Sequence, residues 1–198
     1  MTAIEAIATL LGIACVALAA WRSVWTFPTA IGSVTLLGIV VWDARLYSDA
    51  MLQAFFVAAN LYGWRNWIRH RDRDGEVAVG RMGSSARWRW ASGIVAAAFV
   101  WGGTMRGLTD AAYPWWDAAI AAASIAAQIL MARRRVENWI LWIAIDCASV
   151  PLYLLKGLHL LAVLYLIYLL LALWGWWGWR AALRSAAVPP TPATEALA

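Results

Sequence analysis

Asp146 is the residue whose type and setting most clearly point to chemistry in this sequence. It is a carboxylate eight positions into the apolar run 138–155. Such a group needs a partner, a water-filled cavity or a proton. Asp146 could therefore help to bind a polar or cationic solute, or it could be protonated and hydrogen-bonded to a neighbouring helix.

Three apolar runs carry polar and aromatic side chains at steps of three, four or seven residues, which place them on one face of a helix. Polar residues within membrane spans mark function more often than decoration. Aromatic faces also attract delocalised cations, by ~0.5–2 kcal/mol each. The three faces are Gln53, Asn60, Trp64 and Trp67; Trp139, Trp142, Asp146, Ser149 and Tyr153; and Tyr165, Tyr168, Trp176 and Trp179.

These faces predict a site for a small polar, aromatic or cationic solute, near the bilayer midplane. Aromatic rings would sandwich the solute ring, and amide and hydroxyl groups would bind its hydroxyls. The predicted substrate-binding residues are Gln53, Asn60, Trp64, Trp142, Asp146, Ser149, Tyr165, Tyr168 and Trp176.

The tryptophans have a simpler interpretation as anchors, because a Trp near the end of a span usually lies at the membrane interface. We expect that role for those near span ends. Trp64 and Trp142 share a face with polar residues, so either role is open for them. The expected anchors are Trp25, Trp90, Trp115 and Trp179.

The sequence contains no recognisable enzyme constellation. His70 and His159 have no second histidine at metal-ligand spacing, and there is no Gly-rich phosphate loop, Gly-x-Ser-x-Gly or zinc-ligand cluster. Cys15 and Cys147 lie inside apolar runs and are expected to be small packing residues. We therefore expect no enzyme activity, no metal and no cofactor.

The composition indicates the elements that must position these residues. Of 198 residues, 64% are hydrophobic, 14% are charged and 16 are Trp, whereas soluble domains average about 25% charged. A span needs ~20 apolar residues, and the alternation of β-barrel strands is absent. We predict one all-α integral membrane domain with seven transmembrane helices, the first a retained span, at about 3–21, 26–42, 50–67, 90–108, 114–132, 138–155 and 158–179.

The basic residues predict the orientation. With the N-terminus outside and the C-terminus in the cytoplasm, 13 of the 16 Lys and Arg residues lie inside, and only Arg45, Arg106 and Lys156 lie outside. Cytoplasmic loops are enriched in Lys and Arg. The polar segment 68–89 is therefore expected to be a cytoplasmic linker, although its basic cluster could also bind RNA or anionic lipid.

An internal repeat appears when the sequence is shifted by 112 positions. The shift superposes Gly63 on Gly175, Trp64 on Trp176 and Trp67 on Trp179. Two three-helix units with the same direction need one span between them, which is an arrangement known among transporters. We predict a 3+1+3 architecture: residues 1–67, a basic loop and linking helix at 68–113, residues 114–180, and a disordered cytoplasmic tail at 181–198.

Seven short strings of residues occur along the chain as a recognisable series: WTFPT at 25–29, ARLYSD at 44–49, LQAFF at 52–56, NLYGWRNW at 60–67, ENWILW at 137–142, YLIY at 165–168 and GW at 175–176. Each string alone is weak, but the series is specific. Together these segments resemble the PnuC family of bacterial vitamin transporters, best known for nicotinamide riboside. The match covers about residues 20–180, in the right order and spacing.

The resemblance implies a fold like a full-length SWEET transporter, homotrimers, and uptake across the bacterial inner membrane by facilitated diffusion. A cytoplasmic kinase would phosphorylate the solute and so trap it. The substrate is expected to be nicotinamide riboside. Arg65 replaces an expected aromatic residue, which leaves thiamine, or another vitamin carried within the family such as riboflavin, as the alternative. A non-transporting assembly or signalling subunit is the alternative from another class.

Overall fold

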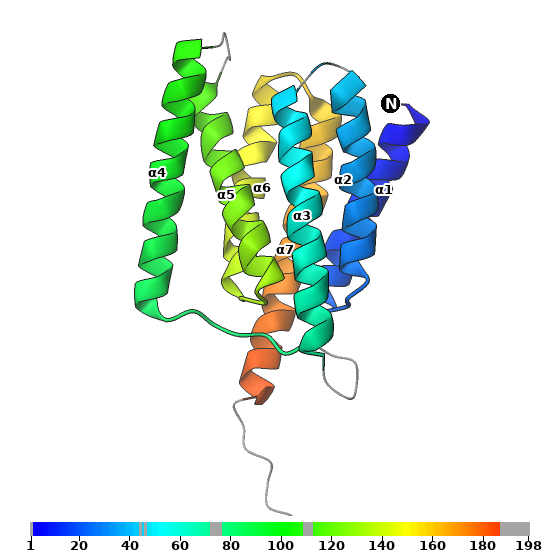
Figure 1. The fold of residues 1–198 in the computed structure, drawn as a ribbon, viewed down its shortest axis with the longest axis vertical. Helices are drawn as coiled ribbons and strands as arrows, with labels where there is room; N and C mark the ends of the chain where they lie inside the picture. Colours follow the sequence, from blue (N-terminus) through cyan, green and yellow to red (C-terminus); the bar gives the residue numbers. More distant parts are fainter. Residues whose placement is uncertain (1, 44, 46, 72–76, 109–112, 187–198) are drawn as a thin grey trace, which may run out of the picture.

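The computed structural model describes residues 2–43, 45, 47–71, 77–108 and 113–186. Within these ranges the chain forms seven α-helices and no strand, as predicted (Figure 1). The C-terminal helix continues to residue 186, and the rest of the predicted tail lies outside the described residues. The helices are α1 (Ala3–Ala20), α2 (Thr26–Asp43), α3 (Tyr47–Arg69), α4 (Ser84–Leu108), α5 (Pro114–Ala132), α6 (Glu137–Leu155) and α7 (His159–Ala186).

Five helices are long and apolar enough to cross a membrane: α1, α2, α5, α6 and α7. The other two, α3 and α4, have 23 and 25 residues. At 1.5 Å rise per residue, either is longer than the ~30 Å hydrocarbon core. Their lower hydropathy comes from polar and basic residues, including Asn60, Arg65 and Asn66 in α3.

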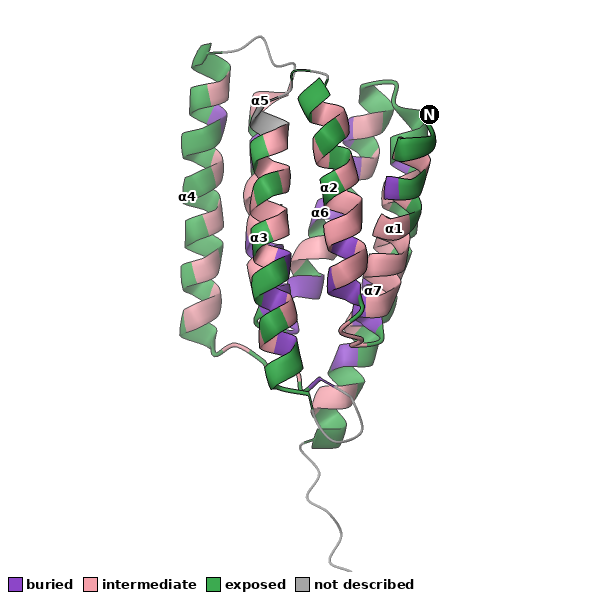
Figure 2. Cartoon of the chain, turned by 45° about the vertical axis from the view of Figure 1, so that its right-hand side comes forward, coloured by how far each residue is buried: buried purple, intermediate pink, exposed green. Residues whose placement is uncertain are grey.

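Six helices form a closed ring, and one lies outside it. Neighbouring helices contact each other in the order α1, α2, α3, α5, α6, α7 and back to α1, while α4 packs against α5. Figure 1 shows α4 at the edge of the bundle. In Figure 2 it is exposed along most of its length, and Gly102 is its buried residue. The ring therefore consists of two three-helix groups, α1–α3 and α5–α7, and the linking helix α4 is not part of it.

The turns of the two groups match at an offset of 112 residues. Arg22 after α1 and Arg134 after α5 adopt φ of 58° and 59°, a left-handed conformation that commonly ends a helix. Each is followed by the same closing hydrogen bond: Ser23 N donates to Leu18 O, and Arg135 N donates to Leu130 O, both at 2.9 Å. Likewise Arg45 after α2 and Gly157 after α6 have φ of 60° and 72°.

The core is an aromatic cluster in which the two groups meet, formed by Phe27, Trp67, Trp139 and Trp179. The Trp67 and Trp179 rings lie 5.7 Å apart between centroids. Phe27 packs edge-on against Trp67 at 5.0 Å, and Trp139 packs edge-on against Trp179 at 5.7 Å. Phe27 and Trp139 are again 112 residues apart.

Hydrogen bonds across this cluster are reciprocal. Trp67 Nε1 donates to Met131 O at the end of α5, and Trp179 Nε1 donates to Ala19 O at the end of α1, both at 3.0 Å. The donors and the acceptors each differ by 112 positions. On these matched turns, rings and hydrogen bonds we propose that α1–α3 and α5–α7 are parallel repeats, related by a pseudo-two-fold axis near Trp67 and Trp179.

Two glycines, Gly63 on α3 and Gly175 on α7, leave space for aromatic side chains of the cluster to lie against these helices. A Cβ at Gly63 would come 2.4 Å from the Phe27 ring, and a Cβ at Gly175 would come 2.4 Å from the Trp139 ring. Real Cβ atoms do not approach other atoms this closely. Gly63 and Gly175 therefore allow the Phe27 and Trp139 rings to approach α3 and α7 closely.

Most basic residues lie at one end of the bundle, which we call the basic end. It contains the α1–α2 and α5–α6 turns, the end of α3, the start of α4 and the end of α7 (Figure 1). Arg45, Arg106 and Lys156 belong to the opposite end. Arg73 lies outside the described residues. The predicted separation of charge thus coincides with two ends of one helical bundle.

Candidate functional site

Asp146 lies in the middle of α6, where side chains of α7 approach it. Asp146 is 3% exposed, and it lies within electrostatic range of Tyr165 and Tyr168. Within the described residues the ion pairs are Arg87–Glu137 and Lys156–Asp117, and neither includes Asp146. The carboxylate therefore has phenolic neighbours and no basic partner in this part of the chain.

The phenols form a connected group on α6 and α7. The ring centroids of Tyr153 and Tyr165 are 5.0 Å apart, with the ring planes tilted against each other. Tyr165 and Tyr168 are 5.8 Å apart in a T-shaped arrangement. The hydroxyl of Tyr168 reaches α1, where it lies 2.6 Å from the position of a Cβ on Gly12. Gly12 thus provides the space for Tyr168.

Ser149 lies one turn beyond Asp146 on the same helix. It is fully buried, and its Oγ has no hydrogen-bond partner among the described residues. A buried hydroxyl normally finds a partner. Ser149 therefore adds an unused donor and acceptor to the polar face of α6.

Asn60 and Gln128 form a second polar pair between α3 and α5. Gln128 Nε2 donates to Asn60 Oδ1 at 2.9 Å, and Asn60 Nδ2 donates to Phe56 O at 2.8 Å. Both side chains are buried. Gln128 was not among the predicted site residues, although it is a lone amide within the apolar run 114–132, and polar residues within membrane spans mark functional positions.

Gln53 lies nearer the opposite end of α3 and is half-buried. Its Cβ packs 3.4 Å from the position of a Cβ on Gly38 of α2. The structure thus places Gln53 at the α2–α3 contact, two turns from Asn60.

Trp64, Trp142 and Trp176 are grouped around the aromatic cluster rather than around Asp146. All three are partly buried and pack against it. The Arg180 guanidinium lies 5.0 Å above the Trp176 ring, a cation–π contact on the side of the basic end. Trp142 precedes Asp146 by one helical turn, so it connects the aromatic group with the polar group.

The anchor interpretation is wrong for Trp179, which is fully buried in the aromatic cluster. Its position near the basic end resembled an interface position because the sequence does not show that α7 continues past it. Trp25 is 65% exposed, as an anchor would be. Trp115 is 41% exposed and places its ring against Gly102 of α4, and Trp90 lines a groove between α4 and α5.

The predicted site residues therefore fall into three groups: Asp146 and Ser149 with the tyrosines on α6 and α7, Asn60 with Gln128, and the tryptophans near the basic end. All come from helices of the closed ring. A ring of apolar helices with buried polar and aromatic side chains is the arrangement of a small-solute transporter. The comparisons with known proteins give the same class.

The chain belongs to the nicotinamide mononucleotide transporter family, whose model matches residues 2–181. It is similar to the nicotinamide riboside transporter PnuC of Escherichia coli K12, with 30% identity over 187 residues, 82% of this chain and 78% of that protein. It is also similar to the riboflavin/roseoflavin transporter RibM of Streptomyces davaonensis, with 35% identity over 164 residues, 77% and 73% of the two chains.

The fold is that of a solved relative. The crystal structure described as the vitamin B3 transporter PnuC matches with a TM-score of 0.76 and 23% identity, over 92% of this chain and 82% of that chain. The resemblance noted in the sequence is confirmed, and the protein is a multi-span membrane transporter of this vitamin-transporting family.

Proposed function

We propose that this protein takes up nicotinamide riboside across the bacterial inner membrane by facilitated diffusion. The observation that carries the proposal is Asp146, a buried carboxylate beside Tyr165 and Tyr168 with no basic partner in the described residues. Nicotinamide riboside carries a positive pyridinium ring. A carboxylate flanked by aromatic rings suits such a cation, because both attract delocalised positive charge.

The other parts of the solute have matching groups. The ribose hydroxyls would bind to Ser149 on α6 and to the Asn60 and Gln128 amides, which lie on the α3–α5 side of the ring of helices. Trp142, one turn from Asp146, offers a face for the pyridinium ring. Gln53, Trp64 and Trp176 would line the path on either side. The site would lie between the two three-helix groups, where repeat interfaces of transporters hold their solutes.

Riboflavin is the second candidate substrate, favoured by the 35% identity to the riboflavin/roseoflavin transporter RibM. Riboflavin is a neutral ring system with a polar chain, so an ionised Asp146 would offer it hydrogen bonds but no attraction between opposite charges. Thiamine is an aromatic cation like nicotinamide riboside and would use the same carboxylate. The charge of the preferred solute therefore separates riboflavin from the other two.

We propose further that the N-terminus lies outside and the basic end faces the cytoplasm, since Lys and Arg accumulate on cytoplasmic loops. A cytoplasmic kinase would add a phosphate to the solute and prevent its return. We also propose that the protein forms a homotrimer, as the resemblance to the PnuC family implies. The outer face of α4 carries exposed apolar residues that a second copy or lipid would cover: Val95, Phe99, Val100 and Trp101.

Uptake of labelled nicotinamide riboside, thiamine and riboflavin into proteoliposomes tests the proposal. We expect nicotinamide riboside to enter fastest and an excess of it to compete with labelled thiamine. Faster uptake of riboflavin, unaffected by excess nicotinamide riboside, would overturn the substrate assignment. Uptake of none of the three, by protein that is folded and inserted, would favour a non-transporting role.

A further inference from the structure

A short segment between α3 and α4 is held tightly against the basic end of the ring. We call residues 77–83 the strap. Gly80 N donates to Arg134 O, and Val136 N donates to Gly80 O, both at 2.9 Å, so that Gly80 and Arg135 form a parallel bridge. Arg134 Nη1 also donates to Ala78 O at 2.9 Å. The strap is thus bonded along its backbone to the α5–α6 turn.

The Arg134 side chain that makes this contact lies partly out of water. Burial lowers the pKa of its guanidinium from the usual value, and the like charge of Arg135 lowers it further. Arginine nevertheless keeps its charge in proteins. The protein therefore bears an electrostatic cost to place a charged donor on the strap.

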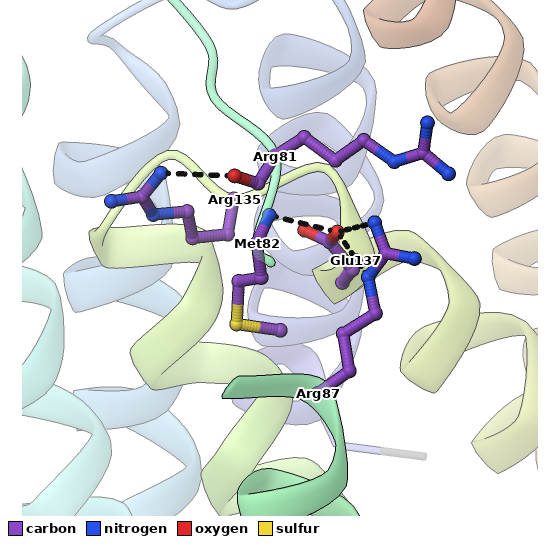
Figure 3. A network of polar contacts seen from close by, with 5 residues as sticks. All are labelled: Arg81, Met82, Arg87, Arg135 and Glu137. Carbon is purple, nitrogen blue, oxygen red and sulfur yellow. Dashed lines mark hydrogen bonds and ion pairs between the residues drawn. The ribbon is translucent and has the colours of Figure 1, made fainter. Parts of the chain in front are cut away.

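Glu137 fastens the end of the strap and the start of α4 (Figure 3). Its Oε1 accepts hydrogen bonds from Met82 N at 2.9 Å and from Arg87 Nε at 3.0 Å, and Arg87 Nη2 lies at 3.0 Å. Glu137 is only 6% exposed, and it stands at the start of α6, where the helix dipole favours a negative charge. Charge-assisted hydrogen bonds of this kind are the stronger ones.

The strap also closes over the aromatic cluster. Val77 is fully buried against it together with Trp67, Trp139 and Trp179, and Val79 packs on its edge. A cavity of about 500 Å³ adjoins the strap, lined by Val77, Ala78 and Val79, by Arg22 of the α1–α2 turn and by residues of α7. The strap therefore covers the place where the two three-helix groups meet, with free space beside it.

This fastening is specific to the second group. Trp25 stands 112 positions before Glu137 and is 65% exposed, so the α1–α2 turn has no carboxylate in the corresponding place. The two turns otherwise share their backbone geometry. Glu137 is thus an addition to the shared architecture rather than a part of it.

We propose that the strap is a latch that keeps the basic end of the ring closed. Solute leaves through this end only when the Glu137–Arg87 contact opens and Val77 withdraws from the aromatic cluster. The effect of the latch on solute release rests on the proposed transport function, but the opening of the strap can be measured without any substrate. Two experiments follow, one for the opening and one for its effect on transport.

The first experiment measures the rate at which a membrane-impermeant thiol reagent modifies Val77→Cys, added to the side of the basic end. Glu137→Gln in the same chain should speed modification about tenfold, as expected for one weakened charge-assisted hydrogen bond. The matched control is Asp117→Asn, which removes the ion pair to Lys156 at the opposite end and should leave the rate unchanged. The chain without Val77→Cys gives the background from Cys15 and Cys147.

If Glu137→Gln does not raise the modification rate of Val77→Cys, the latch is wrong. If Glu137→Gln and Asp117→Asn raise it equally, the latch is also wrong, because the increase would then reflect a general loosening of the protein. Thermal melting of each variant keeps the comparison valid: a Glu137→Gln chain that melts at the wild-type temperature but is modified faster has opened locally.

The second experiment links the strap to the turn with the pair Gly80→Cys and Arg135→Cys. A Cβ at Gly80 would meet only the Arg135 side chain, at 2.8 Å from its Nη1. The Arg135→Cys substitution removes that guanidinium, so the new side chain of Gly80→Cys has room. The oxidised protein should bind substrate but lose uptake into proteoliposomes, and a reducing agent should restore uptake in the same sample. Full uptake by the crosslinked protein would overturn the proposal.

The two failures are distinguishable. If the protein does not carry nicotinamide riboside, the reduced pair and the wild-type chain both fail to take it up, while the labelling experiment is unaffected. If the latch is wrong, the reduced pair transports and oxidation changes nothing.

Discussion

Asp146 is the residue on which the substrate proposal depends most. Asp146→Asn keeps the size of the side chain and removes its charge. We expect the affinity for nicotinamide riboside to fall about tenfold to a hundredfold, equivalent to ~1–3 kcal/mol for one buried contact. Calorimetry on purified protein measures this directly.

The control for that variant is Asp117→Asn, since Asp117 is a partly exposed carboxylate paired with Lys156 at the end of the bundle. It should bind like the wild-type chain. Unchanged affinity in Asp146→Asn would remove the carboxylate from the site, and riboflavin would then become the better candidate.

Substitutions of Asn60 on α3 and Trp142 on α6 test whether the site extends from one side of the ring of helices to the other. Asn60→Ala removes an amide hydrogen-bonded to Gln128, and Trp142→Ala removes an aromatic face one turn from Asp146. Each should weaken binding by ~1–3 kcal/mol while the protein stays folded and inserted. Trp115→Ala, on the α4–α5 side, should do little. Equal affinity in all three variants would exclude these two faces from the site.

At the scale of the helices, the glycines beneath the aromatic cluster make the packing testable. Gly175→Ala places a Cβ 2.4 Å from the Trp139 ring, and overpacking of this kind costs about 1–3 kcal/mol. Gly93→Ala is the matched control, because a Cβ there meets nothing within 4 Å. We expect a lower melting temperature in detergent for Gly175→Ala and no decrease for Gly93→Ala. Equal melting of the two variants would contradict the described packing.

The helices themselves could be predicted closely from the sequence. Apolar length marks five of them, α1, α2, α5, α6 and α7, and residues such as Gly157 and Pro114 mark the ends of helices. The bounds differ most where charged residues extend a helix beyond its apolar run, at the start of α4 (Ser84 rather than residue 90) and at the end of α7 (Ala186 rather than residue 179). The repeat at 112 positions also showed Trp67 and Trp179 as equivalent positions, but it did not predict that their rings pack against each other. The acceptors of these indole groups could not be predicted, because Met131 and Ala19 contribute backbone carbonyls, and every residue has one.

The candidate site was predicted less completely than the fold. Helical spacing placed Asp146 with Ser149 on α6 and Tyr165 with Tyr168 on α7, and in the structure Asp146 lies within electrostatic range of both tyrosines. The spacing does not give the position of a residue along the bundle axis, so Trp64 and Trp176 were grouped with residues that lie further from the basic end. The role of Glu137 was missed for a similar reason. A carboxylate at the start of a helix looks solvated until the strap that covers it is seen.

For the molecule as a whole, the separation of basic residues predicts its orientation. We expect reporter fusions to place both the 77–83 strap and the end of α7 in the cytoplasm, because 13 of the 16 Lys and Arg residues lie in the sequence segments predicted to be inside. A reporter at the α6–α7 turn should lie outside. A fusion at either the strap or the end of α7 that reports the outside would contradict the orientation and the direction of the proposed latch.

The measurement that tests the central claim most directly is equilibration of labelled nicotinamide riboside into proteoliposomes without ATP or an ion gradient. We expect the label to reach the same concentration inside and outside, at a rate that an ionophore does not change, because facilitated diffusion needs no energy source. Asp146 could couple solute movement to protons, so the ionophore is the decisive addition. No entry above that of empty liposomes, or entry that the ionophore abolishes, would contradict the account.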